Sequence, residues 1–160
     1  MGALLTSYAR AAAERLGLRA NLAPYVADRP GYEYFESPED NRRLIESHHG
    51  CADGRVRVWI GMEHLTYSTD AGFKKAVEWA DKYDVGIHIH ADESLSMAQI
   101  VERNEGKREV EILHDKGLLG ERTILAHCVW LSQPEMALVA ESGAHVAHCP
   151  VSNLKLASGV

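Results

Sequence analysis

The chain has 160 residues, of which 46% are hydrophobic and 25% are charged, as in globular proteins with a buried core. Its net charge of −6 argues against nucleic acid as a partner, because binding to a phosphate backbone requires a basic surface. No apolar run approaches membrane-spanning length, and the N-terminal segment has the pattern of an amphipathic helix rather than of a targeting signal. Three scattered cysteines without a CxxC pair predict reduced thiols and a cytoplasmic location.

The first half of the chain alternates helical patterns with short strand-like runs. In order, the pattern predicts a helix over 3–16, a strand over 18–25, a helix over 38–50, a strand over 55–60, a loop over 61–69 and a helix over 70–83. The start of the second helix is marked by a capping serine, Ser37, followed by Pro38 at the first helical position.

The second half continues the same alternation. The pattern predicts a strand over 85–90, helical residues over 94–116 with a break at Gly106, a strand over 122–127, a helix between Ser132 and Gly143, a strand over 144–148 and a loop over 149–160. Ser132 and Glu135 have the spacing of a capping box, which fixes the start of the last predicted helix.

Repeated strand–helix units predict a parallel sheet, which is either an open doubly wound sheet or a closed barrel. The open sheet usually carries a glycine-rich phosphate turn, and the chain contains neither GxGxxG nor GxxxxGK. Histidines mark the strand ends instead: His90, His127 and His148 close three predicted strands, and His64 lies in the loop beyond another. In a parallel barrel all C-terminal strand ends open onto one mouth, where these side chains would converge. The pattern therefore favours an α/β barrel.

The sequence HIHADE, residues 88–93, carries the sharpest chemical pattern. Side chains alternate along a strand, so His88 and His90 point to one side and Ile87 and Ile89 to the other. Neutral imidazoles bind zinc-class ions, and the carboxylate of Glu93, one short turn later, is placed to move protons. The alternative is a pair of core histidines with satisfied hydrogen bonds.

Two further histidine motifs follow. His127 ends the next predicted strand in AHC; such a histidine is more often structural, but its register with His90 favours a functional role. His148 opens HCPVSN after the following strand, where it either supports the site or hydrogen-bonds a loop. The absence of HExxH, of GxSxG and of the HxE…PCxxC pattern sets aside three other hydrolytic chemistries.

HIHADE, AHCVWL and VAHCPVSNLKLASG, in this order and spacing, resemble the amidohydrolase superfamily. The resemblance is strongest to the branch of chlorotriazine hydrolases, guanine deaminases and methylthioadenosine/adenosylhomocysteine deaminases. It implies a (β/α)₈ barrel in which His90 binds the metal, Glu93 is the catalytic carboxylate and His127 contacts the attacking hydroxide and the substrate. It also implies that His64 contacts the substrate.

Two elements of the family's pattern have no counterpart in the chain. The HxH pair of the first strand would precede Met1, and the metal-binding aspartate of the eighth strand would follow Val160. The resemblance therefore implies that residues 1–160 form one incomplete barrel domain that holds about strands three to seven.

The reaction that the resemblance implies is hydrolysis of a carbon–nitrogen bond outside peptides, with deamination of a purine, pyrimidine or triazine ring as the expected case. One divalent metal would activate water, with zinc expected and iron as the alternative. The expected partner is a small-molecule substrate, with no nucleic acid and no membrane, and the complete enzyme is expected to form a homo-oligomer.

Two alternatives stay open. One is a two-metal cyclic amidase of the same superfamily, which uses a carboxylated lysine at the end of the fourth strand; RVRVWIGMEH contains no lysine, which favours one metal. The other is a barrel fragment that has no activity by itself.

Overall fold

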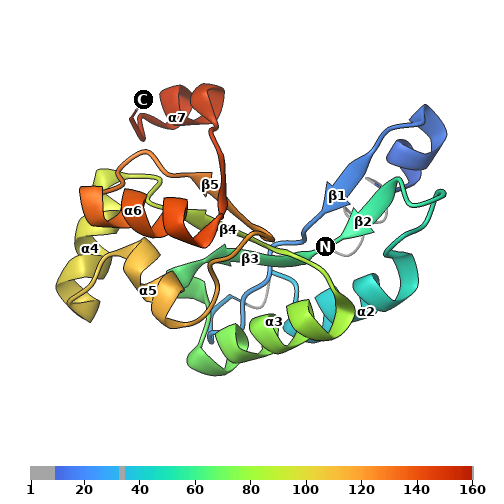
Figure 1. Cartoon of the computed structure of the whole chain (residues 1–160), viewed down its shortest axis with the longest axis horizontal. Coiled ribbons are helices and arrows are strands. Elements are labelled where there is room, and N and C mark those ends of the chain that lie inside the picture. Colours follow the sequence, from blue (N-terminus) through green and yellow to red (C-terminus); the bar gives the residue numbers. More distant parts are fainter. Residues whose placement is uncertain (1–9, 33–34, 160) are drawn as a thin grey trace. The chain divides into compact units, whose positions relative to one another are not determined.

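The computed structural model describes residues 10–32 and 35–159, which form two compact units (Figure 1). The first unit comprises Met1–Glu63 and Tyr67–Ile87, and the second comprises His64–Thr66 and His88–Val160. The helix predicted over 3–16 is present over 10–16, and its earlier part lies outside the described residues. Within the described residues, no helix is both long enough and apolar enough to cross a membrane.

The first unit contains two short parallel strands that pair with each other and two helices that pack together. β1 and β2 pair in register from Ala20 opposite Val56, and α2 packs on both β2 and α3. The predicted start of α2 is confirmed by a complete capping box between Ser37 and Asp40, whereas the helix ends at His48 and not at the predicted Gly50. The predicted bounds of α3 are those observed. The elements of this part of the chain are β1 (Ala20–Leu22), α2 (Pro38–His48), β2 (Val56–Val58), β3 (Ile60–His64), the short 3₁₀ helix η1 (Leu65–Tyr67) and α3 (Asp70–Tyr83).

The loop predicted over 61–69 is wrong in its first part, because the chain resumes as a strand, β3, at Ile60. The role of Gly61 is close backbone contact, because a Cβ atom there would clash with the carbonyl oxygen of Pro24. The amide of Gly61 also donates a hydrogen bond of 2.9 Å to the side chain of Asn41. His64 is therefore the last residue of a strand and not a loop residue.

In the second unit, strands β4, β5 and β6 lie side by side in chain order. β5 and β6 are parallel, with Ile124 opposite His145, and a helix follows each strand. This order without a reversal suits a barrel, whereas a doubly wound sheet changes direction at a switch point. The elements are β4 (Ile87–Ala91, whose first residue belongs to the first unit), α4 (Leu95–Glu105), α5 (Glu109–Asp115), β5 (Thr123–His127), α6 (Gln133–Ser142), β6 (His145–Ala147) and α7 (Pro150–Leu156).

Local sequence signals set the helix ends of this unit. The break predicted at Gly106 is confirmed, since this glycine caps α4 in the left-handed conformation with φ +70°. The predicted capping box of Ser132 and Glu135 is also confirmed at the start of α6. The helices α4, α5 and α6 pack in sequence, and α7 stands apart from them in the view of Figure 1.

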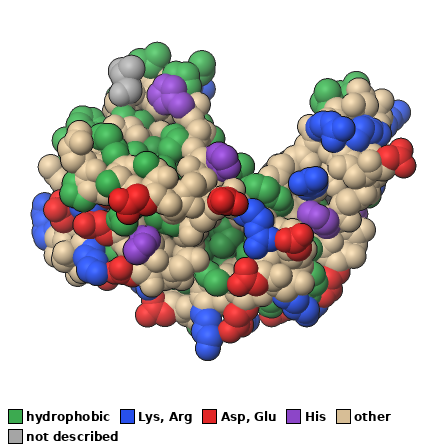
Figure 2. Space-filling view, in the orientation of Figure 1, with side chains coloured by type: hydrophobic (Ala, Val, Ile, Leu, Met, Phe, Trp, Pro, Cys, Tyr) green, Lys and Arg blue, Asp and Glu red, His purple; other side chains and the backbone are tan. Residues whose placement is uncertain are grey.

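The loop predicted over 149–160 is wrong, because Pro150 opens a two-turn helix, α7. Proline is favoured at the first helical position, where its fixed φ fits and its missing N–H has no partner to lose. Three apolar side chains of this helix, Val151, Leu154 and Leu156, are exposed, as is Val146 on β6. Figure 2 shows exposed hydrophobic side chains around this segment. Within the described residues, nothing covers this apolar surface.

Candidate active site

The histidines of β4 and β5 gather at the C-terminal ends of their strands. Along β4 the side chains alternate as predicted: Ile87, Ile89 and Ala91 are buried, while His88 and His90 face the other side and are partly exposed. The ring of His90 stacks on the ring of His127 at the end of β5, with centroids 5.4 Å apart. The ring of His88 lies edge-on to that of His90 at 5.9 Å. Two residues that the sequence predicted to converge, His90 and His127, are thus in contact.

Burial lowers the pKa of His88, and the neighbouring His90 and His127 lower it further. Desolvation opposes the charged form of an imidazole, as does a second cationic ring close to it. The cluster therefore favours neutral imidazole at His88, the form in which histidine binds metals.

Glu93, the predicted proton-transfer residue, lies beside His127. Its Oε1 atom is 3.7 Å from Nε2 of His127 and accepts a hydrogen bond of 3.4 Å from the hydroxyl of Ser158. The other ring nitrogen of His127, Nδ1, lies 2.7 Å from Oδ1 of Asn153. The backbone at this strand end is strained, because His127 and Cys128 have φ values of +74° and +52°. Such strain in non-glycine residues is concentrated at functional sites.

His64, the predicted substrate contact, is held by other groups. Its Nε2 donates to the carboxylate of Glu109 at 3.0 Å, while its Nδ1 accepts from the backbone amide of Thr66 at 3.3 Å. Glu109 also accepts a hydrogen bond of 2.8 Å from the backbone amide of Asp92, which directly precedes Glu93. His64 is therefore tied, through one buried carboxylate, to the turn that carries the candidate proton-transfer group. Its contact with substrate stays a prediction.

Below the strand ends lies a buried charged network that the sequence reasoning missed. Asp92, Glu109 and Glu135 are fully buried, and Arg108 binds two of them. Its Nε donates to Glu135 at 2.6 Å and its guanidinium also donates to Asp92 at 3.1 Å. In the sequence, Glu135 was visible only as a capping residue, and no local pattern indicated that Arg108 would meet it.

The pKa values of the two acids that contact Arg108 shift in opposite directions. Burial raises the pKa of Asp92 to about 8, and the charges of Glu109 and Glu135 add to this effect. Burial also acts to raise the pKa of Glu135, but hydrogen bonds from Arg108 and Ser132 outweigh it and lower that pKa. The network thus favours a protonated Asp92 beside an ionised Glu135 that is paired with Arg108.

Replacing Arg108 by alanine is expected to destabilise the protein by about 3–5 kcal/mol, because it leaves the buried carboxylate of Glu135 without its counter-charge. Urea unfolding of wild type and variant, followed by circular dichroism, measures the difference. Arg103→Ala is the matched control, since Arg103 is exposed on α4 and its loss should change stability by less than about 0.5 kcal/mol. Equal stability of the Arg108 and Arg103 variants would show that the network contributes little.

The donors present fit part of a metal site. A catalytic zinc ion usually takes three protein ligands and one water. Among residues 10–32 and 35–159, no group of three or more His, Cys, Asp or Glu side chains is arranged to hold a metal. The imidazole of His90, which lies between His88 and His127, has the donor chemistry of one zinc ligand, so further ligands would have to come from elsewhere.

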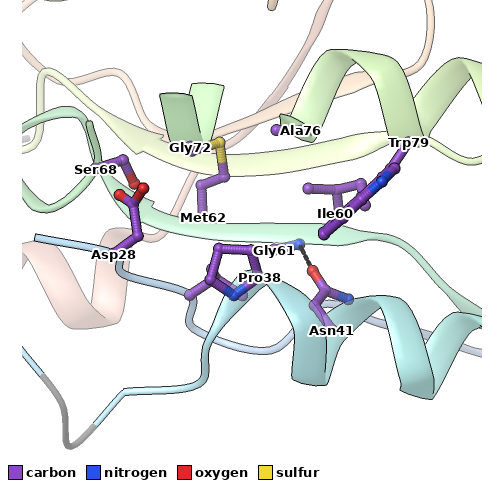
Figure 3. A pocket seen from close by; sticks show the side chains of 11 residues that line it. Asp28, Pro38, Asn41, Ile60, Gly61, Met62, Ser68, Gly72, Ala76 and Trp79 are labelled. Atoms are coloured by element: carbon purple, nitrogen blue, oxygen red, sulfur yellow. Dashed lines mark hydrogen bonds between the residues drawn. The ribbon is translucent and has the colours of Figure 1, made fainter. Parts of the chain in front are cut away.

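A cavity in the first unit is a poor alternative site. It lies between α2, β3 and α3, and Figure 3 shows Asp28 and Asn41 among the largely apolar side chains that line it. Both polar side chains are already engaged: Asp28 accepts hydrogen bonds from Thr69, and Asn41 bonds the backbone of Trp59 and Gly61. None of the four predicted site residues lines this cavity.

Comparisons with known proteins identify relatives of the chain. The chain is 39% identical over 150 residues to a 5'-deoxyadenosine deaminase of Methanothermobacter thermautotrophicus, a match that covers 93% of this chain and 35% of that protein. It is 42% identical over 147 residues to a 5-methylthioadenosine/S-adenosylhomocysteine deaminase of Archaeoglobus fulgidus, covering 90% of this chain and 35% of the relative. The chain thus spans about a third of the length of these relatives.

Solved structures agree with the predicted fold. An adenosine deaminase from Xanthomonas campestris with bound zinc matches 96% of this chain with a TM-score of 0.84 and 28% identity, covering 35% of that structure. Guanine deaminase from Escherichia coli matches 94% with a TM-score of 0.81 and 27% identity, covering 36%. These enzymes are barrels of the amidohydrolase type, so the prediction of a partial (β/α)₈ barrel is confirmed. The model of the amidohydrolase family matches residues 1–160, and the chain therefore belongs to the amidohydrolase family.

Proposed function

We propose that the chain is part of a metal-dependent hydrolase that deaminates the purine ring of an adenosine derivative with a modified 5' position. The observation that carries the proposal is the group at the ends of β4 and β5, where Glu93 lies 3.7 Å from His127 and His127 stacks on His90. This group combines a candidate metal ligand with a carboxylate and an imidazole for proton transfer. The complete protein is the full-length enzyme of which this chain would be a part.

The proposed chemistry replaces an amino group by an oxo group. His90 would hold a divalent ion of the zinc class, which when bound would lower the pKa of water to about 7. Glu93 accepts a proton from the attacking water and delivers it to a ring nitrogen. It then moves the proton of the newly added hydroxyl group to the amino group, which leaves as ammonia as the carbonyl forms. His127 orients the same water from its Nε2 side. Water and the amino-heterocycle are consumed, and the oxo-heterocycle and ammonia are formed, so atoms balance without a redox step.

The relatives support this choice of substrate class. The two relatives with 39% and 42% identity are named as deaminases of 5'-deoxyadenosine and of 5-methylthioadenosine or S-adenosylhomocysteine. An adenosine deaminase and a guanine deaminase share the fold at 28% and 27% identity, and the former was solved with zinc. All of these names describe removal of an amino group from a purine, which favours deamination over the dechlorination that the chlorotriazine branch performs.

The complete protein, purified with zinc, is expected to release one ammonia for each 5'-deoxyadenosine or 5'-methylthioadenosine consumed. The assay should include S-adenosylhomocysteine, adenosine, guanine and an aminated triazine, with ammonia and the ultraviolet spectrum of the product as readouts. Turnover of 5'-modified adenosines above that of guanine and triazine is the expected result. Absence of ammonia release from every aminated ring, or ring opening of a cyclic amide instead, would contradict the proposal.

A further inference from the structure

The segment that follows β6 contacts both candidate proton-transfer groups. It comprises α7 (Pro150–Leu156) and the two residues that follow, up to Ser158. Asn153 reaches Nδ1 of His127, and the hydroxyl of Ser158 reaches the carboxylate of Glu93. Ser158 is itself held in place, because its carbonyl accepts a hydrogen bond of 2.6 Å from the indole of Trp130. One short segment of chain is thus anchored against the two side chains on which the proposed reaction depends.

Asn153 has no structural role that its residue type explains. It lies within α7 rather than at a cap, and asparagine is a poor helix former. It is fully buried, and within the described residues its Nδ2 atom has no hydrogen-bond partner. Among those residues, the hydrogen bond that the Asn153 side chain makes is the one between its Oδ1 atom and Nδ1 of His127. Burying an amide with half of its hydrogen bonds unmade costs free energy, so the remaining bond to His127 needs a reason.

The contact determines which ring nitrogen of His127 carries the proton. An amide oxygen only accepts hydrogen bonds, so Oδ1 of Asn153 at 2.7 Å requires a proton on Nδ1 of His127. In the neutral form of the ring, Nε2 is then unprotonated and can accept a hydrogen bond. It faces Oε1 of Glu93 at 3.7 Å, too far for a direct hydrogen bond but suited to a donor placed between the two acceptors.

We propose that Asn153 is a positioning residue that holds His127 as its Nδ1–H tautomer, so that Nε2 and the carboxylate of Glu93 accept hydrogen bonds from the same water molecule, whose proton then passes to Glu93. This inference rests on the proposed function and assigns one of its determinants to the HCPVSN motif. Asn153 acts through His127 and does not itself contact substrate. Without Asn153, the imidazole of His127 can rotate about its Cβ–Cγ bond or adopt the tautomer that is protonated at Nε2. In either case the lone pair of Nε2 no longer faces the water.

The direct test is the protonation state of the His127 ring in the zinc-loaded complete protein. Ring-labelled ¹⁵N-histidine and long-range ¹H–¹⁵N spectra distinguish a protonated from an unprotonated ring nitrogen, with His127→Gln used to assign the signal. The measurement is made near pH 8, at which an ordinary imidazole is neutral. A protonated Nδ1 and an unprotonated Nε2 are expected. A protonated Nε2 in wild type would overturn the proposal, whatever the activity of the enzyme.

Variants separate positioning from packing. Asn153→Leu keeps the shape but removes the acceptor; it should lose the protonated-Nδ1 signal and lower kcat by about 10–100-fold, as is usual when a supporting hydrogen bond is removed, with KM and zinc content little changed. Asn153→Asp keeps an acceptor and should retain both the Nδ1–H signal and more of the turnover. Asn104→Leu, on the exposed face of α4, is the matched control and should change neither.

The outcomes distinguish this inference from the proposed function. A fall in kcat with an unchanged His127 spectrum would mean that Asn153 only fills space, which overturns the inference. An unchanged kcat in Asn153→Leu would do the same. If the leucine variant does not fold, the wild-type spectrum and the aspartate variant still decide. A complete protein that deaminates no purine yet shows the Nδ1–H tautomer would instead refute the proposed function while leaving the geometric assignment intact.

Discussion

Replacing Glu93 by glutamine in the complete protein is expected to lower kcat by about 10²–10⁴-fold while the metal content stays at the wild-type level. Glutamine preserves the shape of the side chain and can still contact the hydroxyl of Ser158, but its amide cannot take a proton from water. Steady-state kinetics with the best purine substrate, together with elemental analysis of the same samples, measures both quantities.

The control for this substitution is Glu105→Gln, the same change on the exposed end of α4, which should leave kcat unchanged. Near-normal turnover in the Glu93 variant would show that the proton passes through another group. Simultaneous loss of metal would show instead that Glu93 is a metal ligand. Its carboxylate lies near His127, whose ring stacks on that of the candidate ligand His90.

Replacing His90 by alanine is expected to remove the metal from the complete protein, and with it all measurable turnover. A catalytic zinc site has about three protein ligands, so the loss of one removes a large part of its binding free energy. Elemental analysis after extensive dialysis is the measurement, and wild type should retain one equivalent, because the strand that ends at His64 contains no lysine to bridge a second ion.

His145→Ala serves as the control, because His145 is an exposed histidine on the neighbouring strand β6 and should not affect metal content. If the His90 variant keeps its metal, the ligand role passes to His88, whose ring lies 5.9 Å from that of His90. Two tightly held equivalents in wild type would revive the two-metal alternative.

The helix boundaries could be predicted because their causes are local. Ser37 and Ser132 accept hydrogen bonds from amides three residues later, and Gly106 ends α4 through its own left-handed conformation. Each signal acts within one turn of the helix, so it can be read directly in the sequence. The loop predictions over 61–69 and 149–160 are wrong where the chain forms β3 and α7.

The packing around Gly61 shows why the strand β3 was not predicted from the sequence. Its lack of a side chain matters because Pro24 crosses it closely, and its amide is bonded by Asn41, 20 residues away. A glycine in a turn and a glycine under a crossing backbone are identical in a sequence. Only the packed structure decides between them, since the contact joins segments that are distant along the chain.

The same division applies to the candidate site. The sequence by itself determined the family and the barrel class, and it predicted that His90 and His127 meet at the ends of neighbouring strands, because both residues close strands of a parallel sheet. Only the tertiary structure shows which distant groups form hydrogen bonds with the site residues and with the buried charges below them. Asn153 meets His127 across 26 positions, Glu109 meets His64 across 45, and Arg108 meets Glu135 across 27. Such hydrogen bonds form only after strands and helices have packed, and a buried polar group takes the partner that packing brings to it.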